Sequence, residues 1–362
     1  MPDSGFSTLD TQHFSKGAFQ MAKKLRVGLV GAGWPTWQHI KGYRTCDNVE
    51  VAALCDINEK RLHQIADEYK VPKRYVSYEE MFEKEGLDAV SVCSPNALHA
   101  EMSIKAMKKG LHVICEKPMA SSSKLAKEMI KTSKQTGCTL VIGYQRRHGT
   151  NAQYIKRQIE SKKLGEIYFA RAWWVRRQGI PGMGSWFTQK KMSGGGALID
   201  IGVHMLDLAL WFMGYPEPKS VSSSWGSKFG VHGKGSARVT HRGKVGKKPA
   251  FDVDDYAVAH LNFGNGRSLI LQATWATHIG GDESNIELWG DRAGAKLNPT
   301  EIYATTNGTL ETITPKLRDV WAFEPQMRHF IDCIRTGKKT ISPPEEGLKT
   351  VEIIEKIYNN GI

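Results

Sequence analysis

Short apolar runs alternate with amphipathic segments from residue 24 to residue 145 of the chain. The apolar runs have the length of strands, and the segments between them have the spacing of helices. This rhythm predicts an α/β fold with a doubly wound parallel sheet and right-handed crossovers. The expected strands are Arg26–Val30, Val49–Cys55, Ala89–Cys93, His112–Cys115 and Thr139–Ile142, and the expected helices between them include Glu59–Tyr69, Ala97–Lys109 and Ser123–Thr136.

The first expected strand runs directly into Gly31 and Gly33. Glycine at these positions permits a tight turn, and the next helix offers free N–H groups to a pyrophosphate. Thr36 stands where a dinucleotide-binding fingerprint has its third glycine, so the turn alone is weak support. Asp56 follows the second strand, where a carboxylate accepts ribose hydroxyls and repels a 2′-phosphate. The unit predicts NAD rather than NADP as cofactor; the alternative is that Asp56 only caps the next helix.

Two further loops start at the carboxyl ends of expected strands, the edge at which a doubly wound sheet binds its cofactor. One loop carries Ser94, Asn96 and His99. Asn96 could instead be a helix cap, and His99 could be an ordinary surface histidine. The other loop opens with Glu116 and Lys117, a charged pair directly after an apolar strand. We expect this pair at the nicotinamide end of the dinucleotide.

The second part of the chain contains an apolar stretch, Leu198–Met213, directly after Gly194–Gly196 and Ala197. It is apolar on nearly every side, which is typical of a buried helix. Asp200, His204 and Asp207 nevertheless lie at i, i+4 and i+7, on one face. Such a stripe predicts either a satisfied internal network or an active site, because buried charge is costly without a partner. The glycines are expected to let the helix entrance approach cofactor and substrate.

Length and composition fit a two-domain protein. The chain has 362 residues, of which 40% are hydrophobic and 24% charged, as in ordinary globular proteins. No apolar run approaches the roughly 18 residues of a membrane span, and the first 22 residues look like a loose tail without signal-peptide features. We therefore expect no membrane partner and a cytoplasmic location. The six cysteines form no C-x-x-C pair, which favours free thiols and no metal site.

The formal net charge of +13 raises the possibility of nucleic-acid binding. The positive residues are mostly dispersed, and no nucleic-acid-binding module is recognisable, so no nucleic acid is expected as partner. The excess is expected to be a solvated surface that can attract an anionic cofactor. One local basic cluster consists of Arg238, Arg242, Lys244, Lys247 and Lys248.

A third feature of the second part is a segment rich in tryptophan and arginine. A helix is expected at 151–161, and then a strand, Ile167–Arg177, on which Trp174 and Arg176 share one face. These side chains suit a sugar, whose C–H face stacks on a ring while its hydroxyls form hydrogen bonds. At least one of Trp173 and Trp174 should be core, so Trp174 and Arg176 are the expected substrate contacts. Further strands are expected at Tyr256–Phe263, Ser268–Trp275 and Asn285–Trp289, and closing helices at Val320–Ile334 and Gly347–Tyr358.

In this order, the motifs resemble those of the Gfo/Idh/MocA superfamily of oxidoreductases (glucose–fructose oxidoreductase, inositol dehydrogenase and rhizopine catabolism proteins). The resemblance rests on Gly31-Ala32-Gly33, Cys55-Asp56, Ser94-Pro95-Asn96 with His99, Glu116-Lys117-Pro118, and Gly194–Gly196 followed by Asp200, Gly202, His204 and Asp207.

The resemblance implies a Rossmann domain followed by an α+β domain with a large, mostly antiparallel sheet. The open face of that sheet often forms subunit contacts, so a homo-oligomer, a dimer or tetramer, is expected. The resemblance also implies a catalytic group of Lys117, Asp200 and His204, a cis Lys117–Pro118 peptide, and contact between Glu116 and the nicotinamide ribose. Trp34 and Gln145 complete the expected cofactor contacts. The expected division is a tail at 1–22, an NAD-binding domain at 23–145 and a substrate-binding and oligomerisation domain at 146–362.

The leading hypothesis is oxidation of a secondary hydroxyl of a sugar, polyol or glycoside, with hydride passing to NAD; a glycoside 3-oxidoreductase fits. His204 would accept the proton, Asp200 would orient its ring, and Lys117 would stabilise the alkoxide. Asp207, one turn deeper, should be structural, and no metal is required. A rival within enzymes is redox-assisted glycoside cleavage with a recycled cofactor. A rival of another class is a dinucleotide-binding sensor or assembly protein without chemistry.

Overall fold

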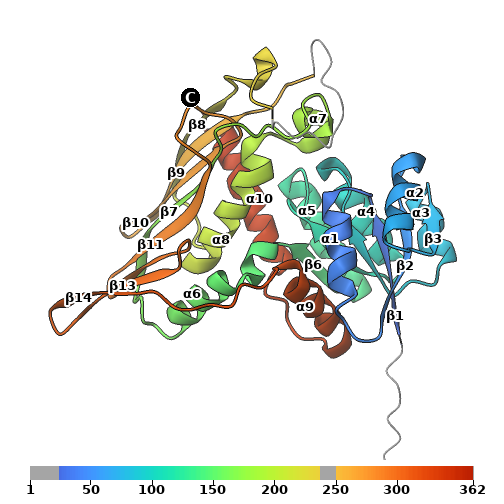
Figure 1. Ribbon diagram of the computed structural model, residues 1–362, viewed down its shortest axis with the longest axis horizontal. Helices are drawn as coiled ribbons and strands as arrows, with labels where there is room; N and C mark the ends of the chain where they lie inside the picture. Colours follow the sequence, from blue (N-terminus) through green and yellow to red (C-terminus); the bar gives the residue numbers. More distant parts are fainter. Residues whose placement is uncertain (1–23, 237–249, 362) are drawn as a thin grey trace, which may run out of the picture.

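Two β-sheets with their covering helices make up the protein (Figure 1). The structure is a computed structural model that describes residues 24–236 and 250–361. The first sheet has the strand order β3-β2-β1-β4-β5-β6, and the second has the order β14-β13-β12-β11-β7-β10-β9-β8. The expected pairing of a doubly wound parallel sheet with a second, mostly antiparallel sheet is confirmed. The expected tail at 1–22 and the basic cluster at 238–248 lie outside the described residues.

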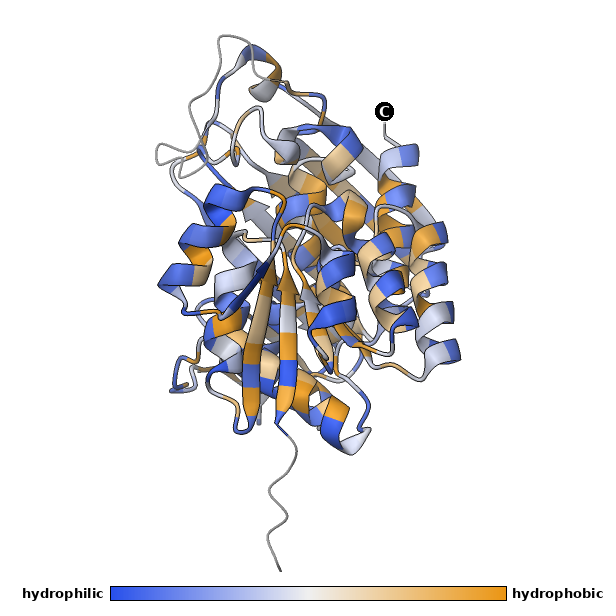
Figure 2. Ribbon diagram, turned by 90° about the vertical axis from the view of Figure 1, so that its right-hand side faces the viewer, coloured by the Kyte–Doolittle hydropathy of each residue, from blue (hydrophilic) through white to orange (hydrophobic). Residues whose placement is uncertain are grey.

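All pairs in the first sheet are parallel, and its strands other than the edge strand β3 are apolar and largely buried, as in sheets covered on both faces (Figure 2). The strand order reverses direction between β1 and β4, the point of a doubly wound sheet at which a ligand-binding crevice is expected beyond the carboxyl ends of the strands. The strands are β1 (Leu25–Val30), β2 (Val49–Cys55), β3 (Lys73–Tyr75), β4 (Ala89–Val92), β5 (His112–Glu116) and β6 (Leu140–Gly143). The helices are α1 (Trp34–Tyr43), α2 (Glu59–Glu68), α3 (Tyr78–Lys84), α4 (His99–Lys108) and α5 (Ser123–Thr136).

The five strands expected from the sequence are all present to within one residue at either end. The additional strand β3 lies at the edge of the sheet and has the sequence Lys-Arg-Tyr. It is too short and too polar to produce an apolar run, and only its pairing with β2 defines it.

The second sheet is antiparallel except for one pair, β7 with β10. Its strands are β7 (Ile167–Val175), β8 (Ser220–Gly226), β9 (Tyr256–Gly264), β10 (Arg267–Thr274), β11 (Glu283–Gly290), β12 (Ala293–Lys296), β13 (Glu301–Thr306) and β14 (Thr309–Ile313). The helices in this part of the chain are α6 (Thr150–Glu160), α7 (Lys190–Ser193), α8 (Val203–Met213), α9 (Phe323–Thr336) and α10 (Pro344–Asn359).

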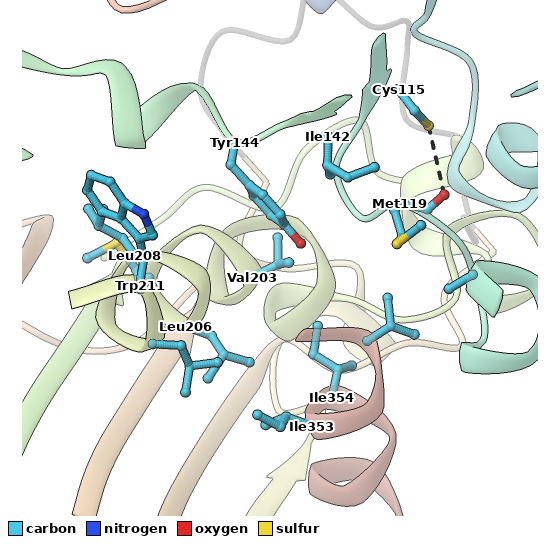
Figure 3. Packing of buried hydrophobic residues seen from close by; sticks show 14 of the residues in the cluster. Cys115, Met119, Ile142, Tyr144, Val203, Leu206, Leu208, Trp211, Ile353 and Ile354 are labelled. Atoms are coloured by element: carbon cyan, nitrogen blue, oxygen red, sulfur yellow. Dashed lines mark hydrogen bonds between the residues drawn. The ribbon is translucent and has the colours of Figure 1, made fainter. Parts of the chain in front are cut away.

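Helix α8 lies on the inner face of the second sheet, against β7, β10 and β11. All of its residues are buried, as expected for a helix that is apolar on nearly every side. Figure 3 shows Val203, Leu206 and Trp211 of this helix beside Tyr144 and Ile354, so the core continues from the first sheet through α8 to α10.

The segment Lys190–Met213 is, among the described residues, the one helical segment long and apolar enough to cross a membrane by length and composition. Its apolar window is 94% buried inside the protein. These residues are therefore the core of a globular fold, although their composition meets the criterion for a membrane span.

The two closing helices return to the first half of the chain. Helix α9 packs on α1 so closely that a Cβ at Gly42 would lie 2.6 Å from Met327 Cγ. Helix α10 packs on α5, β6, β8 and α8 and so joins both sheets. Residues near the C-terminus thus complete the core of the first sheet as well as that of the second.

The domain boundary between residues 145 and 146 stays a prediction. All six cysteines are free, as expected.

Candidate functional site

The turn after β1 is built around Gly31, whose φ is +94° and where a Cβ would lie 2.6 Å from the Cys93 carbonyl oxygen. Only glycine fits that combination of backbone conformation and close approach. Helix α1 then starts with Gly33 as N-cap and with no side-chain cap, so its first N–H groups are available to a phosphate. Thr36, in place of the third glycine, is buried and donates from Oγ1 to the Gly31 carbonyl at 2.5 Å.

Asp56 is tied to this turn. Its Oδ2 accepts from the Ala32 N–H at 2.6 Å, and its Oδ1 accepts from the Asn58 N–H at 2.8 Å. The N-cap of α2 is Asn58, which accepts from the Arg61 N–H, so Asp56 is not the cap of that helix. Arg61 donates from Nε to the Ala32 carbonyl at 2.6 Å and so braces the turn from the other side. The carboxylate therefore lies beside the glycine turn, as a ribose ligand must.

Glu116, at the end of β5, is held by a buried chain of hydrogen bonds. His39 Nε2 lies 3.0 Å from Glu116 Oε1, and His39 Nδ1 lies 3.0 Å from Ser91 Oγ. Tyr43 OH lies 2.7 Å from the same Ser91 Oγ. His39 and Tyr43 come from α1 and Ser91 from β4, and the sequence analysis assigned none of them. The sequence feature that could have identified this group is a polar residue at a position expected to be core: Ser91 interrupts an otherwise apolar strand.

His99 joins the two loops that follow β4 and β5. Its Nδ1 lies 2.7 Å from the Pro118 carbonyl oxygen, and its Nε2 lies 2.9 Å from the Ser94 carbonyl oxygen. Burial lowers the pKa of His99, and the two carbonyls offset this only in part. Both nitrogens are engaged by backbone, so His99 positions the loops rather than offering a hydrogen bond to a cofactor. Asn96 likewise links two segments that are far apart in the sequence, since its Nδ2 donates to the Ser193 carbonyl at 2.8 Å.

Lys117 and Asp200 meet at the junction of the two sheets. Lys117 Nζ donates to the Asp200 carbonyl at 2.8 Å and lies 3.5 Å from Asp200 Oδ1. Trp275 donates from Nε1 to Asp200 Oδ2 at 3.0 Å. The Lys117–Pro118 peptide is cis, as expected. The structure thus brings together two members of the expected catalytic group and adds Trp275, which the sequence analysis had placed only in a strand.

The turn that carries Asp200, Leu198–Gly202, is π-helical, whereas the sequence analysis expected a uniform α-helix. A π turn disturbs the regular backbone ladder and is frequent at functional sites. Here the Asp200 carbonyl accepts from a lysine of the other half of the chain. The i, i+4 spacing had implied contact between Asp200 and His204. That expectation is wrong: within the described residues the Asp200 side chain bonds Lys117 and Trp275, not His204.

His204 follows as the second residue of α8 and is 6% exposed. Its Nδ1 is buried and has no hydrogen-bond partner in the described part of the chain. Burial lowers the pKa of His204 well below its ordinary value, and the charges of Lys117, Arg146 and Arg176 act in the same direction. The lowered pKa favours the neutral imidazole, the form that accepts a proton.

Trp174 lies next to His204, with ring centroids 6.0 Å apart. The Arg146 guanidinium carbon lies 4.3 Å from the centre of the Trp174 ring, and that of Arg176 lies 4.8 Å from it. The expected strand ends at Val175, so Arg176 lies just beyond it, yet its guanidinium reaches the Trp174 ring; Trp173 is the buried member of the tryptophan pair. The ring of Trp174 contacts two arginines, of which the sequence analysis singled out only Arg176.

Asp207 belongs to a different network. Arg147 binds it through two bonds, from Nε to Oδ2 at 3.0 Å and from NH2 to Oδ1 at 2.6 Å. Tyr215 donates to Asp207 Oδ1 at 2.5 Å, and Arg147 also contacts Glu346 of α10. Burial opposes the charge on Arg147, but Asp207, Tyr215 and Glu346 outweigh it and hold the pKa of this guanidinium above its ordinary value. Asp207 is fully paired, in agreement with a structural role.

The glycines before α8 have a packing role that differs from the expected one. A Cβ at Gly196 would lie 1.7 Å from the Asp254 carbonyl oxygen, and one at Gly195 would lie 2.1 Å from Tyr358 OH. The Asp254 carboxylate accepts from the N–H groups of Gly196 and Leu198 at 2.7 and 3.0 Å. The close approach that these glycines permit is thus to Asp254 and Tyr358, and the expectation of an approach to cofactor and substrate is corrected for Gly195 and Gly196.

Comparison with known proteins agrees with this geometry. The family profile described as "Oxidoreductase family, NAD-binding Rossmann fold" matches residues 25–144, and the "GFO/IDH/MocA C-terminal domain" matches residues 152–296. The chain is 33% identical over 341 residues to D-glucoside 3-dehydrogenase of Escherichia coli, covering 93% of this chain and 95% of the relative. It is 26% identical over 288 residues to levoglucosan dehydrogenase of Pseudarthrobacter phenanthrenivorans, covering 76% of this chain and 74% of the relative.

A solved structure of levoglucosan dehydrogenase in complex with NADH and levoglucosan superimposes with a TM-score of 0.79 at 21% identity, over 93% of this chain and 96% of the other. At that identity the likeness concerns the fold. The two family profiles together span both halves of the chain, and the first relative extends over nearly all of it. The chain therefore belongs to the Gfo/Idh/MocA family of oxidoreductases with an NAD-binding Rossmann fold.

Proposed function

We propose that this chain oxidises a secondary hydroxyl of a sugar, polyol or glycoside, with NAD as hydride acceptor. The observation that carries the proposal is the arrangement of Lys117, Asp200 and a neutral His204 beside the edge of an NAD-binding sheet. Such a set supplies a proton acceptor and a fixed positive charge, the two things that removal of a hydride from an alcohol requires of the protein. The relatives named as dehydrogenases of a D-glucoside and of levoglucosan support this substrate class.

The residues present fit NAD. The glycine turn and the uncapped start of α1 suit the pyrophosphate, and Asp56 beside them suits the adenosine ribose. At the other end of the crevice, Glu116 is fixed by His39, and the buried Oε1 of Gln145 has no partner among the described residues. An unpaired buried oxygen is costly, and a hydrogen-bond donor from a bound cofactor would satisfy it. Trp34, 43% exposed at the start of α1, and Ser94 are the remaining proposed contacts.

In the proposed reaction, bound NAD supplies the carbon that takes up the hydride. His204 accepts the hydroxyl proton, because burial and the neighbouring cations keep its imidazole neutral and so able to accept one. Lys117, held by the Asp200 carbonyl, presents its ammonium group where negative charge grows on that oxygen. Asp200 acts on Lys117 rather than on the imidazole, and Trp275 fixes the carboxylate in turn.

The test is a panel of sugars, polyols and glycosides with NAD and with NADP, followed at the absorbance band of NADH. His204→Asn and Lys117→Met should each lower kcat by about 10² to 10⁴ on the accepted substrate. Lys124→Met, an exposed lysine of α5, is the matched control and should leave the rate unchanged. Wild-type rates in both active-site variants would contradict the proposed roles. Binding of NAD without turnover across the panel would favour a non-catalytic dinucleotide-binding protein, and hydrolysis without accumulation of NADH would favour redox-assisted cleavage.

Two finer features belong to the same proposal. The second sheet exposes Tyr168, Trp289 and Tyr303, which are 43%, 49% and 39% exposed, and large exposed aromatic side chains on one sheet suit a subunit contact. We propose a homo-oligomer formed through this sheet, to be tested by light scattering of the wild type and of Trp289→Ser.

The free cysteines suit a reducing compartment, so we propose a cytoplasmic location.

A further inference from the structure

Two adjacent arginines of the site differ sharply in how they are paired. The Arg147 guanidinium is saturated by Asp207, Glu346, Tyr215 and the Ile341 carbonyl. The guanidinium of Arg146, one residue earlier, makes no hydrogen bond and no ion pair to any residue in 24–236 or 250–361. Burial and the charge of Arg176 lower the pKa of Arg146 to about 10. A desolvated cation without an anion is an unfavourable arrangement that a bound anion would relieve.

Arg176 also lacks an anionic partner among the described residues. Its NH1 donates to the Gly179 carbonyl at 3.2 Å, and no carboxylate of the described residues lies within ion-pair distance of it. Both guanidinium carbons lie over the Trp174 ring, at 4.3 and 4.8 Å from its centre. A guanidinium stacked on an aromatic face keeps its in-plane N–H groups free, and these are the donors that bind a carboxylate or phosphate in pairs.

The charge balance around His204 points the same way. Three cations, Lys117, Arg146 and Arg176, act on this imidazole, and the nearby carboxylate of Asp200 is already bonded to Lys117 and Trp275. Lys117 faces the reacting oxygen in the proposed chemistry, which leaves the two arginines without a negative counterpart. A neutral sugar would leave this excess in place, whereas an acidic one would remove it.

We propose that Arg146 and Arg176 together bind an anionic group of the substrate, so that the physiological substrate is an acidic sugar or glycoside bearing a carboxylate or a phosphate. This rests on the proposed oxidoreductase function and narrows its substrate class. Trp174 holds the two guanidinium groups at the site, and His204, whose ring lies 6.0 Å from that of Trp174, is then close to the carbon skeleton that the anion anchors. The anionic group itself takes no part in the bond changes.

Binding is measured by calorimetry on the enzyme saturated with NADH, so that the result does not depend on turnover. The probes are methyl β-D-glucoside, methyl β-D-glucuronide and glucose 6-phosphate. Charge-assisted hydrogen bonds to the anion should make at least one acidic probe bind about tenfold to a hundredfold more tightly than the neutral glucoside. Preference for the glucuronide identifies a carboxylate, and preference for the phosphate ester identifies a phosphate.

The variants are Arg146→Gln and Arg176→Gln, with Arg171→Gln as control. Arg171 lies on β7, the strand that Arg176 directly follows, but it is exposed and its guanidinium contacts the ring of Trp173 instead. Each test variant should lower the affinity for the acidic probe more than that for the neutral glucoside, so that the preference is lost, while the control keeps the preference. Thermal denaturation verifies that the variants fold, and Arg146→Lys, which keeps the charge, should retain part of the preference.

Equal affinity of the wild type for acidic and neutral probes would overturn the inference, as would equal losses for both probes in the arginine variants. In the second case the arginines would serve hydroxyl groups. Failure of the function itself looks different: no NADH would form with any substrate of the panel, whatever the order of affinities. Turnover of neutral glycosides without an acidic preference would keep the function and remove only this inference.

Discussion

The two carboxylates of the central helical segment should respond in opposite ways to the same substitution. Asp207→Asn removes the charge that faces Arg147, whose side chain is 0% exposed. Asp200→Asn removes a carboxylate that is 19% exposed and lies 3.5 Å from Lys117. The first change should lower stability and the second should lower activity, because only Asp207 belongs to a closed network inside the core.

The magnitude for Asp207→Asn follows from what is left behind. Breaking a buried ion pair by removing one partner costs about 3 to 5 kcal/mol. Glu346 still contacts Arg147 and is 29% exposed, so the guanidinium keeps one anionic partner and the cost falls near about 3 kcal/mol. With an unfolding entropy of about 2.1 cal/mol/K per residue over 362 residues, this corresponds to a fall in Tm of about 4 °C. Asp200→Asn loses a partly exposed pair worth about 0 to 1 kcal/mol, or at most about 1 °C.

The assay compares scanning calorimetry with steady-state turnover for the wild type and both variants. Asp207→Asn should keep most of its kcat at a temperature well below its Tm, and Asp200→Asn should lose kcat while its Tm stays close to that of the wild type. The reasoning is refuted if Asp207→Asn shows an unchanged Tm together with abolished turnover. That result would assign Asp207 to the chemistry and leave Arg147 adequately paired without it.

Three further predictions follow from the buried histidines and the glycine contacts. The pKa of His204 is lowered, so the neutral base persists below pH 6.5 and kcat/KM should stay flat from pH 7.5 to 6.5; an acidic limb centred above 6.5 would contradict this. Burial lowers the pKa of His148 to about 3, so the unfolded chain binds a proton below about pH 6.5 that the folded chain refuses. The free energy of unfolding should therefore fall as pH decreases from 7 to 5, by up to about 1.4 kcal/mol per pH unit for this histidine, and Tm should fall with it; a Tm independent of pH would refute the linkage. Gly196→Ala places a Cβ against the Asp254 carbonyl oxygen and should destabilise the fold by about 1 to 3 kcal/mol, measured by urea denaturation. In the control Gly110→Ala the new Cβ meets no neighbour, so this variant should show only the strain of the positive φ.

Sequence reasoning reached the parts of the structure whose signals are local. The strands of the first sheet are continuous apolar runs, and the glycine turn, Asp56 and Lys117 each follow directly after such a run, so strand ends and cofactor edge were predicted together. It failed where the determining contact is long-range. Strand β12 has only four residues, β13 and β14 are short and mostly polar or exposed, and only pairing with neighbours defines these strands.

The partners of Asp200 show the same limit. A regular helix places Asp200 next to His204, and nothing in the local sequence signals that Leu198–Gly202 is π-helical. The turn is defined by contacts from far along the chain: Lys117 binds the Asp200 carbonyl, Trp275 binds its carboxylate, and Asp254 binds the N–H groups at the helix entrance. A period of 3.6 residues predicts which side chains share a face, but it cannot predict which of them bond to each other.

Asp207 and Asp200 have different partners, and this explains why one helical segment can be both a rigid core element and part of a reactive site. Arg147 binds Asp207, Glu346 of α10 and the Ile341 carbonyl, so α8 is fixed to the C-terminal part of the chain at a point three residues after His204. With that anchor in place, His204 can stay in the core without a partner for Nδ1, because the backbone that carries it does not depend on that bond. Asp200, one turn earlier, takes up Lys117 and leaves the imidazole with cations as its charged neighbours. The neutral imidazole thus results from carboxylates that are committed elsewhere, and moving either carboxylate onto His204 would raise its pKa and favour the protonated form.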